Sequence, residues 1–221
     1  GEIAWAVENQ FYNVFIDSTL VDLGFPQIGP IAIALMVNIT TIVGTIATII
    51  MGSYSDVLGK RKPFLFYGLI LWAITTAIFP FSALINFGVI SIIFFAILFD
   101  SIMTFFGGTV QNAAVNAYIT DVTNRKTRSK AQSIKQIATL LSLLIVYGVL
   151  GLLIDFIGYY PFFFLVGGLV AVIGLIGVSK ARESAELEPL GINTFQHLKN
   201  TFKKKSSVNY KQFILVLLVI A

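Results

Sequence analysis

The chain has 221 residues, of which 57% are apolar and only 12% are charged, and its mean hydropathy is +0.87. Soluble domains carry about 25% charged residues, so this composition excludes a soluble enzyme, a disordered tail and a small secreted module. The sequence contains no cysteine, which excludes disulfides and thiolate metal sites. We predict no cofactor and no bound metal.

Six apolar runs follow one another, and each is long enough to cross a hydrocarbon layer of about 30 Å as a helix. They are Ile3–Leu23, Ile28–Met51, Pro63–Ser82, Gly88–Ala117, Ala131–Ile154 and Pro161–Val178. We therefore expect an all-α membrane protein with a six-helix bundle over 1–179. A linker over 180–211 and the start of a seventh helix over 212–221 complete the chain, which we interpret as an internal piece of a longer protein.

The basic residues indicate how the runs are oriented. All 15 Lys and Arg residues stand in three segments, at 60–62, 125–135 and 180–211. A basic excess on every second connection is the positive-inside pattern. We expect these segments and the N-terminus to be cytoplasmic in a multi-pass protein of the inner or plasma membrane. A nucleic-acid partner is not expected, because it would require a basic patch on a soluble surface.

A repeat with an offset of 99 residues relates the first three runs to the next three. The pattern Gly-x-x-x-Asp-x-x-Gly begins at Gly52 and again at Gly151. The same offset pairs Asn13 with Asn112. Because each copy holds an odd number of spans, the second copy must enter the membrane from the opposite side. We therefore expect an inverted 3+3 repeat of 1–82 and 83–179.

Polar side chains gather in the first and fourth runs. An ionised carboxylate at mid-bilayer costs roughly 2.5–3.5 kcal/mol, so such residues face a cavity or a partner. We expect no Lys or Arg within the spans to neutralise Asp100 or Glu8. A proton or a cation from elsewhere would do so. The residues expected to face such a cavity and to bind what enters it are Glu8, Tyr12, Asn13, Asp17, Asp100, Thr104, Gln111, Asn112 and Asn116. For Asn9, hydrogen bonding to a neighbouring helix and a place in the cavity remain open alternatives.

The second run is polar in a different way. We expect its polar side chains to donate hydrogen bonds to nearby backbone carbonyls rather than to bind a ligand. These residues are Asn38, Thr41, Thr45 and Thr48.

The segment Gly52-x-x-x-Asp56-x-x-Gly59-Lys60-Arg61 resembles the signature loop between the second and third helices of the major facilitator superfamily. The segment from Asp121 to Arg128 is similar to the loop between its fourth and fifth helices. The resemblance implies that the chain is the N-terminal half of a twelve-helix transporter, whose C-terminal half is a partner. It also implies a loop that latches one conformational state, with the residues Gly52, Asp56, Gly59, Lys60, Arg61, Asp121 and Arg128.

The linker contains a short amphipathic pattern. Apolar residues recur at helical spacing between Pro189 and Lys205, which predicts a helix lying on the anionic inner leaflet. We expect His197, the only histidine, to be a bystander on this helix.

Within the superfamily, the acidic and aromatic first run and the acid in the fourth resemble the glycoside–pentoside–hexuronide cation symporters and the sucrose-type carriers. That likeness implies a small-molecule sugar or glycoside as the substrate. Sodium-coupled members carry acids in their second helix, and Ile28–Met51 has none, so we expect coupling to protons rather than to sodium.

Two alternatives accompany this interpretation. One is a proton-coupled drug exporter, and the other is a transport-dead membrane sensor or scaffold. A membrane-embedded enzyme is not expected, because the sequence contains neither His-Glu-x-x-His nor Gly-x-Gly-Asp.

Overall fold

The computed structural model of the protein describes residues 2–85, 87–183 and 187–203, and these form helices joined by short turns, with no strand among them. The predicted seventh helix at 212–221 lies outside the described residues. The elements are α1 (Glu2–Val7), η1 (Glu8–Tyr12), α2 (Asn13–Asp22), α3 (Gly29–Leu58), α4 (Lys62–Ile78), η2 (Phe79–Leu84), α5 (Val89–Gly107), η3 (Gly108–Ala114), α6 (Val115–Val122), α7 (Arg128–Ile145), η4 (Val146–Leu150), α8 (Gly151–Ile157), α9 (Tyr159–Lys180) and α10 (Thr194–Lys203). η1, η3 and η4 are π-helical and η2 is 3₁₀.

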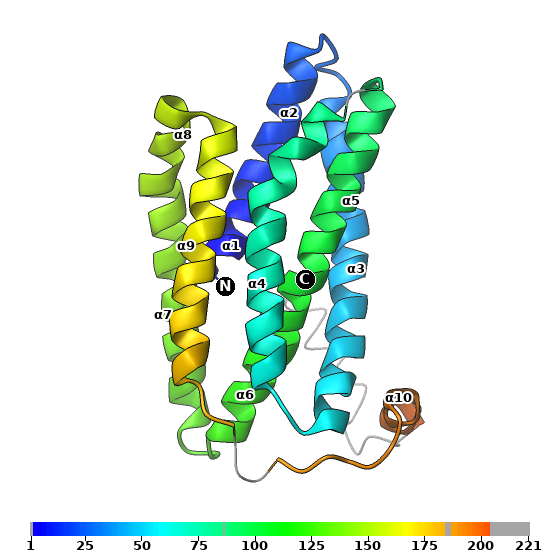
Figure 1. Ribbon diagram of the computed structural model, residues 1–221, viewed down its shortest axis with the longest axis vertical. Helices are drawn as coiled ribbons and strands as arrows, with labels where there is room; N and C mark the ends of the chain where they lie inside the picture. Colours follow the sequence, from blue (N-terminus) through cyan, green and yellow to red (C-terminus); the bar gives the residue numbers. More distant parts are fainter. Residues whose placement is uncertain (1, 86, 184–186, 204–221) are drawn as a thin grey trace, which may run out of the picture.

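The elements join end to end into a bundle of six roughly parallel helices that run alternately up and down (Figure 1). Five of them, within the described residues, are long and apolar enough to cross a membrane. The first helix, α1–η1–α2, is not among the five, although it lies in the same bundle. It contains four acidic residues, which are Glu2, Glu8, Asp17 and Asp22.

Proline and glycine set the helix ends. α3 and α4 each have a proline in the first turn, where the missing N–H has no intrahelical partner to lose. Gly59 ends α3 with φ 62°, a left-handed conformation that glycine adopts at low cost. Gly158 separates α8 from α9 and also has a positive φ, of 75°, although its ψ of 172° differs from that of Gly59. α3 continues past the predicted end at Met51, through the first part of the signature segment, and ends at Leu58.

The bounds of the helices repeat with the offset found in the sequence. α3 covers 29–58, and the helix formed by α7, η4 and α8 covers 128–157. The first and fourth helices both contain a π turn, at 8–12 and 108–114. The first helix of one triplet runs up in Figure 1 and its counterpart runs down, so the two triplets have opposite polarity.

Small residues and aromatic rings hold the bundle together. A Cβ added to Gly108 would lie 2.9 Å from the carbonyl oxygen of Gly44, so α3 and η3 approach each other backbone to backbone. Next to the first helix, the buried ring of Tyr12 stacks on Phe79 at 3.5 Å between centroids. Close packing of this kind is the main attraction between helices where lipid tails replace water.

The two ends of the bundle differ in chemistry. We call the end formed by 59–62, 123–127, 181–183 and 187–193, at the bottom of Figure 1, the basic end. At the opposite end, aromatic rings meet across helices: Phe15 contacts Tyr159 at 5.2 Å, and Phe81 contacts Tyr160 at 5.9 Å between centroids.

Candidate functional site

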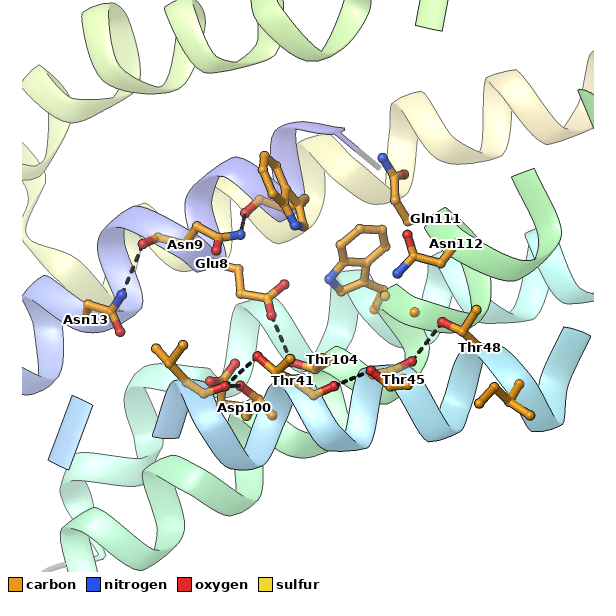
Figure 2. A pocket seen from close by; sticks show the side chains of 18 residues that line it. Glu8, Asn9, Asn13, Thr41, Thr45, Thr48, Asp100, Thr104, Gln111 and Asn112 are labelled. Atoms are coloured by element: carbon orange, nitrogen blue, oxygen red, sulfur yellow. Dashed lines mark hydrogen bonds between the residues drawn. The ribbon is translucent and has the colours of Figure 1, made fainter. Parts of the chain in front are cut away.

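A polar cavity of about 470 Å³ opens between the first, second and fourth helices. Figure 2 shows side chains from these three helices pointing toward one another across it. It is lined by Trp5, Glu8, Asn9, Asn13, Val37, Thr40, Thr41, Gly44, Thr45, Thr48, Ile49, Trp72, Asp100, Thr104, Gly107, Gly108, Gln111 and Asn112. Such a volume suits a small-molecule ligand.

Two carboxylates meet on one side of the cavity. Glu8 comes from η1 and Asp100 from α5, and Thr104 follows Asp100 by one helical turn. The Thr104 hydroxyl donates a hydrogen bond of 2.8 Å to Oε1 of Glu8, which ties the first helix to the fourth. Neither acid forms an ion pair with a described residue.

Of the two acids, Asp100 is the one with an unpaired buried oxygen. Its side chain is buried, with 4% exposure, and its Oδ1 has no hydrogen-bond partner among the described residues. A buried polar atom without a partner is costly, so this oxygen is equipped to receive a proton, a cation or a hydroxyl donor.

A row of threonines on α3 forms the facing wall. Thr41, Thr45 and Thr48 each donate to a carbonyl earlier in the same helix, at 2.7–2.8 Å. The prediction that these hydroxyls satisfy themselves on the backbone is confirmed. The same side chains also line the cavity, which the sequence interpretation missed. Their acceptor lone pairs remain available to a ligand.

Two tryptophans complete the lining. Trp5 is partly exposed, whereas Trp72 of α4 is fully buried, and the indole N–H of Trp72 has no partner among the described residues. An added Cβ at Gly107 would lie 3.1 Å from the Trp72 ring, so this glycine makes room for the indole. The sequence interpretation missed Trp72, because it searched the first and fourth runs for polar residues.

Amide side chains lie on opposite sides of the cavity, with Asn9 and Asn13 on one side and Gln111 and Asn112 on the other (Figure 2). Gln111 donates to a carboxylate oxygen of Glu2, and the second oxygen of that carboxylate accepts a 2.7 Å hydrogen bond from Thr139 of α7. Glu2 therefore joins the first, fourth and fifth helices. Asn9 and Asn13 donate to the carbonyls of Trp5 and Asn9 within their own helix and also line the cavity.

Three of the predicted site residues do not line the cavity. Tyr12 points into the core, where its hydroxyl contacts the sulfur of Met103 at 2.8 Å. Asp17 lies where the first helix turns into α3, so close to Gly29 that a Cβ there would clash with its carboxylate. Asn116 is engaged by Lys135, whose Nζ donates to its Oδ1 at 2.9 Å. Lys135 lies within α7, so the expectation that no cation occurs within the spans is wrong at this position.

The signature loop forms a second polar cluster, centred on the buried Arg61 at the basic end. Its guanidinium binds Asp56 at 2.6 Å, Asp121 at 2.8 Å and the Ser55 hydroxyl at 2.8 Å. Burial alone would lower the pKa of Arg61, but the hydrogen bonds and charges of Asp121 and Asp56 outweigh it and raise that pKa above its ordinary value. The ends of the second and fourth helices are thus fastened through one side chain.

The other residues expected to form the latch occupy different places. Gly52 lies 3.7 Å, measured from an ideal Cβ, from Ala113 in η3. Lys60 is exposed and forms no ion pair with a described residue. Arg128 stands apart from the Arg61 cluster and donates to the carbonyl of Thr120 at 3.1 Å.

The linker runs across the signature loop. Both oxygens of Glu183 accept the backbone N–H of Arg61 at 3.0 Å, and one also accepts that of Lys62 at 2.7 Å. Glu183 therefore caps the N-terminus of α4. An added Cβ at Gly59 would lie 2.8 Å from the linker backbone at Glu188, which explains why glycine fits this position.

Part of the linker is helical. It begins at Thr194 and ends at Lys203 as α10, and it packs against α3. His197 of α10 contacts the Ser53 hydroxyl at 2.9 Å. This histidine therefore takes part in fastening the linker to the bundle.

The sequence profile of the Major Facilitator Superfamily matches residues 6–221, which include the cavity, the signature loop and the linker. Neither the curated proteins nor the solved structures give a match. The profile covers nearly the whole chain and agrees with the all-helical bundle of membrane-length helices. The chain therefore belongs to the Major Facilitator Superfamily, whose members are membrane transporters.

Proposed function

We propose that this chain is the N-terminal half of a symporter that carries a sugar or glycoside together with a proton by alternating access. In this mechanism two bundles of helices rock about a site near the middle of the membrane. The polar cavity is our candidate for this bundle's share of that site, and a second six-helix bundle would cover its open side. We place the protein in the inner or plasma membrane, with the basic end in the cytoplasm, because the basic residues follow the positive-inside pattern.

The observation that carries the proposal is the unpartnered carboxylate oxygen of Asp100 beside the Glu8–Thr104 hydrogen bond. A proton arriving at Asp100 would neutralise a buried carboxylate whose Oδ1 lacks a hydrogen-bond partner among the described residues. It would also alter the balance of charge between two acids that belong to different helices. Because Thr104 joins the fourth helix to Glu8 of the first helix, a proton on Asp100 would change how strongly these two helices are held together.

The chemistry of the lining supports a polyhydroxylated substrate. Carboxylates, threonine hydroxyls and amide side chains accept and donate hydrogen bonds in the mixed pattern that sugar hydroxyls require. Trp5, which is 41% exposed, offers an apolar face on which a pyranose ring can stack. A lipophilic cation would instead favour a wall with fewer hydrogen-bonding groups.

The Arg61 cluster supplies the latch of this proposal. Its ion pairs fasten the second helix to the fourth at the basic end, so they favour the state in which this end is closed. On the proposed orientation, that state opens to the outside.

The substitution Asp100→Asn tests the proton role in the full-length protein in liposomes. The amide keeps the shape of the side chain but cannot take up a proton in the same way. We expect uptake driven by a proton gradient to be lost, while exchange of labelled for unlabelled substrate persists in part. Asp155→Asn, at an exposed carboxylate outside the cavity, is the matched control and should leave uptake unchanged. Fully concentrative uptake by the Asp100→Asn variant contradicts the proposal.

A ligand panel distinguishes the alternatives. Sugars that quench the fluorescence of Trp5 and Trp72 support uptake of a sugar. Binding of lipophilic cations, with no response to sugars, supports drug export. Tight binding without flux in either direction supports a sensor or scaffold.

A further inference from the structure

An apolar groove of about 280 Å³ lies outside the polar cavity, between α3 and α4. Tyr54 and Leu58 of α3 form one wall, and Tyr67 and Leu71 of α4 form the other. All four side chains are substantially exposed, from 38% for Leu71 to 64% for Tyr67. The groove therefore opens sideways, between two helices of the bundle, and not into the transport cavity.

The length of the groove matches one leaflet of a bilayer. It extends from Leu58 to Met51 on α3 and from Pro63 to Leu71 on α4, which is about 10–12 Å at 1.5 Å per residue. Half of a hydrocarbon core is about 15 Å thick. The groove thus starts where the helices leave the membrane at the basic end and follows most of the depth of one leaflet.

The lining offers little to a polar solute. Thr109, at the floor, uses its hydroxyl to donate to the carbonyl of Phe105 at 2.8 Å. The remaining walls are aliphatic or aromatic, apart from the two tyrosine hydroxyls. An extended hydrocarbon chain is the occupant that this lining fits.

Two lysines stand at the mouth of the groove. Lys60 and Lys62 are within two residues of the lining residues Leu58 and Pro63. Neither forms an ion pair with a described residue, whereas Arg61 between them is fully engaged by Asp56 and Asp121. The two lysines therefore adjoin both walls of the groove in sequence, and among the described residues no carboxylate forms an ion pair with either of them.

We propose that the groove and these two lysines form a binding site for an anionic phospholipid of the leaflet at the basic end. One acyl chain lies in the groove, and the phosphate lies between Lys60 and Lys62. A groove and a bilayer are similarly apolar surroundings for the chain, so the preference for this lipid comes from the headgroup. Each lysine near an anionic headgroup is worth about a fivefold gain in binding. The site is independent of the transported substrate.

The experiment uses the full-length protein in nanodiscs that contain a trace of lipid with a photoreactive acyl chain. Phosphatidylglycerol is the anionic probe, phosphatidylcholine is the neutral probe, and labelled peptides are identified by mass spectrometry. We expect labelling within 51–71, with phosphatidylglycerol favoured about tenfold or more. The double variant Lys60→Gln/Lys62→Gln should remove most of this preference. The variant Leu71→Trp should fill the groove and reduce labelling by both lipids.

Each variant has a matched control. Lys126→Gln/Lys130→Gln changes two exposed lysines of the neighbouring basic segment, one in the turn before α7 and one in its first turn. Leu175→Trp changes a leucine of α9 that is 41% exposed, close to the 38% of Leu71. Both controls should label as the unaltered protein does. Equal labelling by the two lipids, or a preference that survives the loss of Lys60 and Lys62, overturns the proposal. So does an unlabelled groove in the unaltered protein, which would mean that a helix of the second half covers it. Because the lysine variant alters only side chains at the surface, its result stands even if Leu71→Trp fails to fold.

Discussion

Arg61 shows how one side chain can organise the end of a bundle. Its planar guanidinium reaches Asp56, Asp121 and Ser55 at once, which a lysine ammonium cannot do with the same geometry. The pairs are only partly shielded from solvent, since the Asp56 side chain is 40% exposed, and each is weaker than a fully buried pair would be. Their value lies in joining three segments through a single residue.

Replacing Arg61 by lysine should therefore destabilise the protein even though the charge is kept. We expect a loss of about 1–3 kcal/mol, because hydrogen bonds to charged groups are broken and two carboxylates lose their partner. In detergent this should lower the midpoint of thermal unfolding by roughly 3–10 °C. Lys60→Ala, at the exposed neighbour, should change the midpoint little. Equal midpoints for Arg61→Lys and the unaltered protein would contradict the role given to the guanidinium.

The candidate site could be predicted only in part from single residues. Glu8, Asp100 and Thr104 were found because carboxylates are rare at membrane depth, and these three do meet. Tyr12 was misplaced because it follows the polar stripe in sequence, yet it shares a helix face with Phe15 and Ile16, which are buried. The place of Trp72 in the cavity lining could not be predicted, because in the sequence a tryptophan among apolar residues cannot be distinguished from an ordinary core residue.

At the scale of elements, hydropathy predicted the six helices and their order, but not their internal shape. A π turn uses the same residues as an α turn, so nothing in the composition of η1 marks it. The wider turn brings residues five apart to one face, and Glu8 and Asn13 accordingly line the same cavity. The helix ends differ from the apolar runs for a related reason, because glycine and the polar signature segment, rather than hydropathy, decide where α3 ends.

The linker is the element whose contacts were least expected. Glu183 should hold the first turn of α4 by placing its negative charge on free N–H groups at a helix N-terminus. Replacing it by glutamine should expose the amides of Arg61 and Lys62, which we expect to exchange with deuterium about tenfold faster. Glu188→Gln is the control, because Glu188 is a nearby exposed acid, whereas the hydrogen bonds to the amides of Arg61 and Lys62 come from Glu183. Unchanged exchange in Glu183→Gln would show that the cap is not what orders this turn.

At the scale of the whole molecule, the alternating direction of the helices predicts that successive connections between them are accessible from opposite sides of the membrane. The sequence has no cysteine, so single-cysteine variants can be labelled without background. Lys126→Cys at the basic end and Phe87→Cys or Phe156→Cys at the other end alter exposed residues. In oriented vesicles, an impermeant thiol reagent should label the two phenylalanine positions from one side and the lysine position from the other. Labelling of all three from the same side would contradict the alternating topology.

The first copy of the signature pattern is followed by Lys60 and Arg61. The second copy, which ends at Gly158, is followed by Tyr159 and Tyr160 instead. The basic end is therefore closed by charged hydrogen bonds, and the opposite end by rings such as Phe15, Phe81 and Tyr160. Forces of these two kinds respond differently to dissolved salt, because ions screen charges and leave aromatic packing nearly untouched. The two ends of a molecule with symmetrical architecture are thus held together by unequal forces, one sensitive to ionic strength and the other dependent on close packing.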